Sequence, residues 1–174
     1  MENKKVNILI TKEQIEKRIA ELGLELSKDY EGKNLYVLSL LRGSFIYTAD
    51  LVRNITVPTK IGFMTTSSYG HNEQSSGSVS VVNDIPDNIE GCDVLVVDDI
   101  VDTGITMQFV MEHVKSLGAN SVKSCVLLDK PERRKVDVKP NYCCFEIPDV
   151  FVVGYGLNYG DYYRNIPYVF NWED

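Results

Sequence analysis

Apolar residues at helical spacing predict three helices along this chain. The first starts with Thr11-Lys12-Glu13-Gln14, which has the form of a capping box. A second begins after Ser44, and a third spans residues 105–117 and ends before Gly118. Each helix is expected to bury its regularly spaced apolar residues: Ile15, Ile19, Leu22 and Leu26 in the first, Phe45, Ala49 and Val52 in the second, and Val110, Met111, Val114 and Leu117 in the third.

Continuous apolar runs predict strands between these helices. The dense runs at 35–41, 94–97 and 122–128 are typical of strands buried on both faces, and 151–153 is a further expected strand. Residues 60–66 and 79–82 flank a polar stretch and would form a long hairpin arm: strand 60–66, loop 67–78, strand 79–82. Strands that alternate with helices predict an α/β fold with a mainly parallel sheet, whose ligands bind at the carboxyl ends of the strands.

Chain length and net charge limit the classes of protein to which this sequence can belong. The chain has 174 residues, which predicts one domain spanning 1–174, large enough to fold without disulfides or metal. Its formal net charge is −7, which disfavours a broad footprint on the phosphate backbone of nucleic acid. A small anion needs only a local cradle of donors, so an anion site remains compatible with this charge.

The apolar runs and cysteines favour a cytoplasmic protein. None of the runs approaches the ~18 residues of a membrane-spanning helix, and Val6–Ile10 is too short for a signal-peptide core. The four cysteines contain no CxxC pair, so we expect buried, reduced thiols, with a redox role as the lesser alternative. They are Cys92, Cys125, Cys143 and Cys144.

The segment VLVVDDIVDTGITM, residues 94–107, carries the clearest chemistry. An apolar strand ends at Asp98-Asp99, and a helix starts after Gly104. A helix start offers unpaired backbone N–H groups and the positive end of the helix dipole, and Gly104 permits close backbone approach. Thr103 and Thr106 add hydroxyl donors. Together these features predict a phosphate cradle.

Three carboxylates in the same segment point to a second part of the ligand. Asp98, Asp99 and Asp102 would repel a phosphate, but adjacent carboxylates at a strand end can bind vicinal sugar hydroxyls or a divalent cation. The implied ligand is a ribose 5′-phosphate. The alternative is that they are turn residues, with Asp102 only capping the helix. The segment contains neither a GxxxxGK phosphate loop nor a GxGxxG turn.

Residues 94–107 resemble the phosphoribosyl-diphosphate signature of the type I phosphoribosyltransferases. From about residue 6 to 168 the chain is similar to the purine-salvage branch of that family, which acts on hypoxanthine and guanine. The resemblance implies a mainly parallel twisted sheet flanked by helices, with a small hood and a hairpin lid. It also implies Mg²⁺ as cofactor and a homodimer or homotetramer. Phosphoribosyl binding would fall to Asp98, Asp99, Asp102, Thr103, Gly104, Ile105 and Thr106.

By the same resemblance, three further segments would hold the diphosphate. Leu41-Arg42-Gly43 matches the diphosphate loop, in which relatives have a cis peptide before the basic residue, here Leu41–Arg42. Ser68 and Tyr69 match the start of the lid that excludes water. Arg164 matches an arginine that grips the diphosphate. The alternatives are an ordinary strand-to-helix turn at Gly43, a solvated hairpin tip at Ser68 and Tyr69, which composition alone would favour, and a surface residue at Arg164.

The resemblance also implies a purine site. Lys130 would donate to the 6-oxo group, Phe151 would stack on the base and the Val152 backbone would read its edge. Asp102 would lie near the imidazole side of the purine as general base. The commoner interpretations are a surface lysine and a core phenylalanine. The adjacent Arg133-Arg134-Lys135 is expected to be a solvated basic turn.

Two positions depart from the family pattern. The family usually has Glu-Asp where this chain has Asp98-Asp99, and we expect the ribose and Mg²⁺ roles to survive the shorter side chain. Asn158 replaces an aspartate that ligates a second Mg²⁺. Asparagine keeps an oxygen but loses the charge, so it would be a weak metal ligand. Its backbone contact to a guanine amino group would be kept.

Three rival functions are compatible with parts of the sequence. A xanthine phosphoribosyltransferase would use the same cradle with another purine edge. A regulator of this fold would bind phosphoribosyl diphosphate and nucleic acid without catalysis; the net charge and the presence of Asp102 oppose it. A structural nucleotide-binding domain would leave Lys130, Phe151 and Arg164 unexplained.

Overall fold

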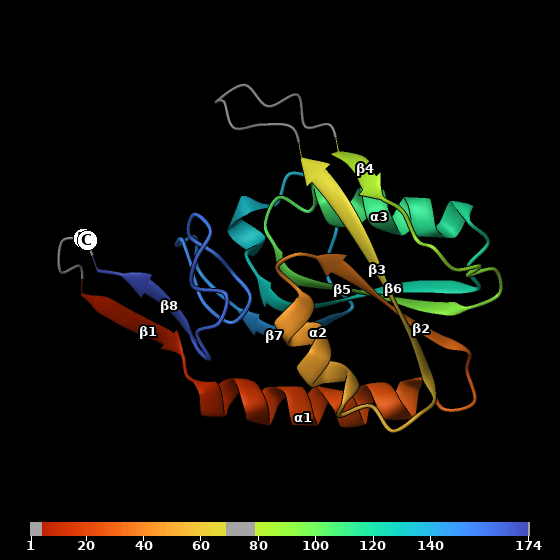
Figure 1. The fold of residues 1–174 in the computed structure, drawn as a ribbon, viewed down its shortest axis with the longest axis horizontal. Coiled ribbons are helices and arrows are strands. Elements are labelled where there is room, and N and C mark those ends of the chain that lie inside the picture. The colour runs from red at the N-terminus through yellow and green to blue at the C-terminus, as the bar shows by residue number, and fades with distance from the viewer. Residues whose placement is uncertain (1–4, 69–78, 174) are drawn as a thin grey trace.

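The computed structural model describes residues 5–68 and 79–173 (Figure 1). In chain order the elements are β1 (Val6–Ile10), α1 (Lys12–Asp29), β2 (Leu35–Leu41), α2 (Phe45–Val52), β3 (Thr59–Ser68), β4 (Val79–Asn83), β5 (Asp93–Val101), α3 (Ile105–Ser116), β6 (Ser121–Asp129), a short 3₁₀ helix (Pro131–Arg133), β7 (Tyr142–Glu146) and β8 (Val169–Trp172). The predicted loop residues 69–78, including Tyr69, lie outside the described residues.

A six-stranded sheet forms the centre of the molecule. Its strand order is β4-β3-β2-β5-β6-β7, with every neighbouring pair parallel except the antiparallel pair β3–β4. This confirms the predicted α/β fold with a mainly parallel sheet, and the paired arms of the predicted hairpin. The chain places β3 next to β2 on one side, and later places β5 next to β2 on the other side. The carboxyl ends of β2 and β5 therefore flank a reversal of strand order, where open α/β sheets bind ligands.

Helices cover both faces of the sheet. Alternate residues of β2 point to opposite sides: Leu35 and Val37 join one core with α1 and α2, whereas Tyr36 and Leu38 join the other with α3. Figure 1 shows α1 and α2 below the sheet and α3 above it. Burial on both faces explains why β2 reads as an unbroken apolar run.

Helices α1 and α3 form largely as predicted. In α1, Thr11 accepts a hydrogen bond from the Gln14 N–H while the Gln14 side chain accepts from the Thr11 N–H, which completes the capping box. All four predicted core residues of α1 are buried. In α3, Val110 and Val114 are buried and Gly118 has the left-handed φ of 87° that ends a helix. Leu117 was expected inside but is 40% exposed, because the helix ends before it.

Helix α2 buries a different face from the predicted one. Phe45 is 42% exposed and Ala49 is exposed, whereas Tyr47, Thr48 and Leu51 are buried. The reason is polar: the Ser39 hydroxyl of β2 shares hydrogen bonds with the hydroxyls of Ser44 and Thr48, at 2.8 Å each. These bonds let a hydroxyl-bearing face pack on the sheet, and the apolar spacing of α2 gave no sign of them.

Two strand predictions need correction, and one strand of the central sheet was not predicted. The strand predicted at 94–97 continues as β5 to Val101, so Asp98 and Asp99 lie in the strand instead of a loop. Residues 151–153 form no regular strand; only Val153 makes an isolated bridge, to Phe170. Sequence reasoning missed β7, the parallel edge strand next to β6.

A separate two-stranded sheet stands beside the central one. It pairs β1 with β8 antiparallel, and these strands come from opposite ends of the chain. We call these two strands together with residues 153–168 the hood, seen at the left of Figure 1. The hood matches the small lobe that the family resemblance implies.

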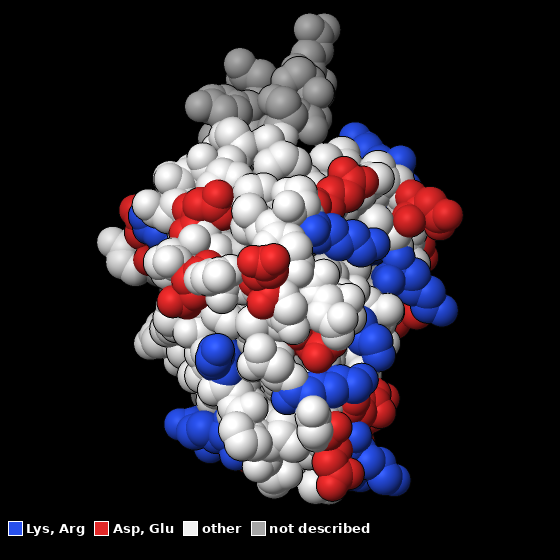
Figure 2. All heavy atoms as spheres, turned by 90° about the vertical axis from the view of Figure 1, so that its right-hand side faces the viewer, with Lys and Arg blue, Asp and Glu red and all other residues white. Residues whose placement is uncertain are grey.

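The charged side chains on the surface and the state of the cysteines agree with the composition of the chain. Acidic and basic side chains are interspersed on the face shown in Figure 2, which is the face away from the hood. All four cysteines are free thiols, three buried and Cys143 half-buried, as expected. Within the described ranges, no helix is long and apolar enough to cross a membrane.

Candidate active site

The loop after β2 forms one wall of the site. The peptide between Leu41 and Arg42 is cis, as the resemblance implies. Gly43 follows and packs so tightly on Asp99 that an added Cβ would come within 1.8 Å of the Asp99 Oδ2 atom. Ser44 fixes the loop from behind by donating its hydroxyl to the Leu40 carbonyl. A larger residue at position 43 would therefore displace the Asp99 carboxylate, and the wall joins the ends of β2 and β5.

The start of α3 forms the floor. Gly104 precedes the helix with φ of 83°, a left-handed conformation that favours glycine. As the N-cap it has no side chain to accept from the first helical N–H groups, and the first turn holds no acidic residue. The Ile105 N–H makes only a long contact, 3.4 Å, to the Thr103 hydroxyl. Donors at this helix start thus remain available to an anion, as the sequence predicts.

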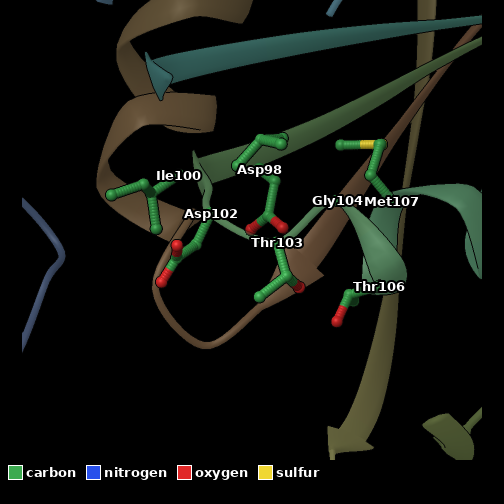
Figure 3. A pocket seen from close by; sticks show the side chains of 8 residues that line it. Asp98, Ile100, Asp102, Thr103, Gly104, Thr106 and Met107 are labelled. Carbon is green, nitrogen blue, oxygen red and sulfur yellow. The ribbon is translucent and has the colours of Figure 1, made fainter. Parts of the chain in front are cut away.

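A cavity of about 120 Å³ opens above this floor (Figure 3). In that view Thr103 lies between Asp102 and Thr106, and the Asp98 carboxylate points toward Thr103. The structure thus brings together most of the predicted phosphoribosyl residues and adds three apolar ones that sequence reasoning missed. The lining residues are Asp98, Ile100, Val101, Asp102, Thr103, Gly104, Thr106 and Met107.

Asp98 and Asp99 are crowded acids at the end of β5. One oxygen of Asp98 accepts from the Asp99 N–H at 2.9 Å, and one of Asp99 accepts from the Ile100 N–H at 2.8 Å. Burial raises the pKa of Asp98 well above its usual value, and the negative charge of Asp99 raises it further. Burial also raises the pKa of Asp99, although the positive charge of Arg164 opposes the rise. Such a pair is stabilised by any cation that reaches it.

These acids do not form a complete metal cage. Within residues 5–68 and 79–173, no group of three or more His, Cys, Asp or Glu side chains is placed to hold a metal ion. Mg²⁺ is commonly held by one or two carboxylates and completed by substrate phosphates and waters. The donor set therefore fits a Mg²⁺ ion that arrives with a phosphorylated substrate.

The predicted purine residues lie where β6 ends and just before the hood. Lys130 follows β6, is 7% exposed and donates its backbone N–H to the Val101 carbonyl at 2.9 Å. Its ammonium is 3.9 Å from Asp149. Phe151 is 60% exposed although it is a large apolar residue, and its ring meets the edge of Tyr159 at 6.1 Å between centroids. The next residue, Val152, is buried.

The hood reaches the wall formed by the loop after β2 through Gly156; we call this wall the diphosphate wall, after the role that the family resemblance implies for it. Its φ is 101°, and an added Cβ would lie 2.2 Å from the Gly43 carbonyl oxygen. Arg164 donates to the Gly156 carbonyl at 2.6 Å, which brings the predicted diphosphate arginine to this wall. Asn158 donates its amide to the Gly160 carbonyl within the hood.

The predicted solvated basic turn holds for Arg133 and Lys135 and is wrong for Arg134, and Arg133 also makes ion pairs that the sequence did not predict. Arg133 places its Nε 2.8 Å from Asp102 Oδ1 and its Nη1 3.5 Å from Asp149 Oδ2. Arg134 pairs with Asp129 and donates to the Val138 carbonyl at 2.7 Å. No signal in the sequence joins Arg133 to an aspartate 31 positions earlier. Arg133 and Lys135 are exposed as expected, whereas Arg134 is half-buried.

The predicted lid residues are only partly described. Ser68 is the last residue of β3, and its backbone pairs with Val79 of β4. Ser67, one position earlier, shares a hydrogen bond with Ser80 at 2.8 Å across this pair. The diphosphate roles of Ser68 and Tyr69 therefore stay predictions.

Comparison with known protein families shows to which family the chain belongs. Residues 6–160 match the phosphoribosyl transferase domain, and the chain belongs to that family. The match spans the diphosphate wall, the cradle and Lys130.

Individual relatives show which members of this family the chain is similar to. The hypoxanthine-guanine phosphoribosyltransferase of Bacillus subtilis (strain 168) is 41% identical over 162 residues, covering 93% of this chain and 90% of the relative. That of Staphylococcus aureus (strain Mu50 / ATCC 700699) is 43% identical over 169 residues, covering 97% and 94%.

Solved structures agree with this assignment. A hypoxanthine phosphoribosyltransferase from Staphylococcus aureus superposes with a TM-score of 0.92 at 42% identity, covering 96% of this chain and 91% of that one. A mutant of the Trypanosoma cruzi hypoxanthine phosphoribosyltransferase, solved as a ternary substrates complex, gives a TM-score of 0.90 at 39% identity, covering 99% and 97%.

Proposed function

We propose that this chain is a purine-salvage enzyme that transfers phosphoribosyl from 5-phosphoribosyl diphosphate to hypoxanthine or guanine. The products are the nucleoside monophosphate and diphosphate. The observation that carries the proposal is the cavity between β5 and α3, where acids and free helix donors face the same space. The named relatives, which cover nearly the whole chain, support the same reaction.

The cradle would hold the ribose 5-phosphate. Backbone N–H groups of Gly104, Ile105 and Thr106, with the hydroxyls of Thr103 and Thr106, would donate to the phosphate oxygens. The carboxylates of Asp98 and Asp99 would accept from the ribose hydroxyls. The anion and the acids occupy different parts of the cavity, so their charges need not oppose each other.

The wall after β2 would hold the diphosphate. The backbone N–H groups of Arg42 and Gly43 would donate to it, in the loop that begins at Leu41. Arg164, anchored to the Gly156 carbonyl, would supply a cation from the hood side. We propose that Ser68 and Tyr69 close over this group from the lid.

We propose Mg²⁺ as the cofactor, held by Asp98 and Asp99, with Asn158 as a weak ligand. When bound, the ion would neutralise charge on the diphosphate leaving group. The raised pKa of Asp98, caused by burial and by Asp99, supports a cation at this edge. Asn158 now bonds to Gly160, so its ligand role would need that amide to turn.

The purine would lie between the cavity and Phe151. Stacking on the exposed Phe151 ring would bury it, and Lys130 would donate to the 6-oxo group, which adenine lacks. The backbone of Val152 would read the base edge, and the Asn158 backbone would meet a guanine amino group. Asp102 would accept the proton from the imidazole nitrogen. The opposite nitrogen forms the bond to the anomeric carbon as the bond to diphosphate breaks, and diphosphate leaves with the electron pair.

We also propose a homodimer or homotetramer. Three large apolar side chains are exposed on one side of the sheet: Phe45 of α2 is 42% exposed, Ile61 of β3 is 43% and Phe63 is 49%. Ser39 pairs with Phe63 across the sheet and bonds to Thr48 of α2, so the two β3 residues lie on the α2 side. Light scattering of the wild type and of Phe63→Glu would test this surface.

The free thiols support a cytoplasmic location. Four cysteines without a disulfide are typical of reducing compartments. Fractionation of the source cells, with an antibody to the chain, would test this location.

The deciding experiment is a steady-state assay with phosphoribosyl diphosphate, hypoxanthine, guanine or xanthine, and a Mg²⁺ titration. Turnover of hypoxanthine and guanine well above xanthine is expected. Preference for xanthine would indicate the sister enzyme. Tight binding of phosphoribosyl diphosphate without turnover of any base would contradict the enzyme function and favour a regulator.

A further inference from the structure

Arg133 and Asp149 connect two side chains that would contact the purine: Asp102, the proposed general base, and Lys130, the proposed donor to the 6-oxo group. The Arg133 Nε lies 2.8 Å from Asp102 Oδ1, and the Arg133 Nη1 lies 3.5 Å from Asp149 Oδ2. The other oxygen of Asp149 lies 3.9 Å from the Lys130 ammonium. Charges therefore alternate along a chain of four residues, from the proposed general base to the proposed reader of the 6-oxo group.

The backbone holds Arg133 in place above the cradle. The Lys130 N–H donates to the Val101 carbonyl, and the Lys135 N–H donates to the Thr103 carbonyl, both at 2.9 Å. These two bonds pin both ends of the turn to the residues on either side of Asp102. Between them, Arg133 donates its own N–H to the Lys130 carbonyl at 3.2 Å. The turn therefore cannot shift without also moving the cradle.

The two oxygens of Asp102 are not equivalent. Oδ1 is fully covered and accepts no hydrogen bond of good geometry from the residues that the structure describes. Its cationic neighbour is the Arg133 Nε, 2.8 Å away, so the contact is an ion pair, and the side chain as a whole is 41% exposed. The exposed part of the carboxylate is therefore the Oδ2 side. A general base needs one oxygen aimed at the proton that it accepts, and a carboxylate fixed at one oxygen loses its freedom to rotate.

We propose that Arg133 is a positioning residue for the reaction: by holding Oδ1 of Asp102, it presents Oδ2 to the imidazole side of the purine. This inference rests on the proposed function, because it takes Asp102 as the general base. Asp149 is the second anchor of the guanidinium, and a planar fork with several donors suits two acceptors better than the single ammonium of lysine.

The simpler explanation is a surface ion pair with no role in turnover. Arg133 is 46% exposed, and pairs of that exposure contribute little to stability. The two explanations differ in one measurable respect. A positioning residue acts through Asp102, so its removal should have no effect on kcat once the Asp102 carboxylate is gone.

The test is a double-mutant cycle on the full-length protein with phosphoribosyl diphosphate and hypoxanthine. The four proteins are wild type, Arg133→Ala, Asp102→Asn and the double variant, with Arg133→Gln as a second replacement that keeps a hydrogen-bond donor on a side chain of intermediate length. Lys139→Ala is the matched control, because Lys139 is an exposed cation after the same turn and makes no ion pair with any residue that the structure describes.

We expect Arg133→Ala to lower kcat about tenfold, with the KM for phosphoribosyl diphosphate unchanged. In the Asp102→Asn background the same change should alter kcat by less than about twofold. Lys139→Ala should match the wild type. Equal losses in both backgrounds, or a wild-type kcat in Arg133→Ala, would overturn the proposal. Absence of turnover in the wild type would instead contradict the proposed function itself.

Discussion

The two ends of strand β5 carry aspartates in opposite situations. At the start of the strand, Asp93 is 7% exposed and accepts hydrogen bonds from Asn120 at 2.8 Å and Ser121 at 2.7 Å. Burial alone would raise its pKa, but these two bonds and the charge of Lys33 lower it overall. At the far end, the pKa values of Asp98 and Asp99 are raised by burial, and for Asp98 also by its neighbour.

The difference separates stability from function within one strand. The protein itself completes the hydrogen bonding of Asp93, so this carboxylate stabilises the fold. At the other end Asp98 lines the cavity and its neighbour Asp99 lies against Gly43, and this crowded pair is costly in the free protein. Such unfavourable groups are concentrated where a ligand completes them.

Asp102→Asn should give the largest change at the carboxyl end. An amide cannot accept the purine proton, so kcat should fall about 10²- to 10⁴-fold. The thermal midpoint should stay close to that of the wild type, because the side chain is 41% exposed. A steady-state assay and a thermal melt measure both. Near-normal turnover would reject Asp102 as the general base.

Asp98→Asn should change stability and activity in opposite directions. Removing one of two crowded charges should raise the free energy of unfolding by about 1 kcal/mol at neutral pH in the ligand-free protein. The lost carboxylate should lower kcat/KM for phosphoribosyl diphosphate about 10- to 100-fold. Chemical denaturation and kinetics on the same preparation give both values. A loss of stability would show that Asp98 is a structural residue like Asp93.

Gly156→Ala should show how closely the hood must approach the diphosphate wall. The new Cβ would lie 2.2 Å from the Gly43 carbonyl oxygen, at a φ of 101° that disfavours alanine. We expect a loss of about 2–4 kcal/mol in stability, and a higher KM for phosphoribosyl diphosphate. Gly160→Ala is the matched control: its φ of 58° is also positive, but nothing lies within 4 Å of its added Cβ. Equal effects of the two changes would mean that backbone strain alone is responsible.

Asp93→Asn should lower stability and leave the kinetics unchanged. Both bonds go to Oδ1, so the amide oxygen can still accept them. Bonds to a neutral acceptor are weaker than bonds to a carboxylate, so the change should cost about 1 kcal/mol. Because the folded-state pKa of Asp93 is lowered, its contribution is full above the unfolded-state value and is lost as pH falls through the folded-state value. The stability gap between wild type and variant should therefore be constant at neutral pH and shrink below about pH 4. Denaturation curves at several pH values measure this gap. A stability gap that widens in acid would contradict a lowered folded-state pKa of Asp93.

Local patterns were enough to predict most of the central sheet and the cradle. A capping box, apolar runs buried on both faces and a glycine before a helix act over a few residues, so α1, β2, β6 and the start of α3 could be predicted. Long-range pairing was out of reach. The hood joins β1 to β8 across the whole chain, and Arg133 meets Asp102 only in the folded protein. The inward face of α2 was missed because hydroxyl pairs, not apolar spacing, decide it.

The aromatic rings of the hood give the protein an optical readout of its own. Trp172 is the chain's one tryptophan, and its ring lies 4.9 Å from that of Tyr159, which in turn meets Phe151 at 6.1 Å. Phe151, on which the base would stack, is therefore two ring contacts from the single tryptophan of the sequence. Purine binding should change the emission of Trp172, and Phe151→Ala should abolish the change. Affinity for the base then becomes measurable without turnover or any added label.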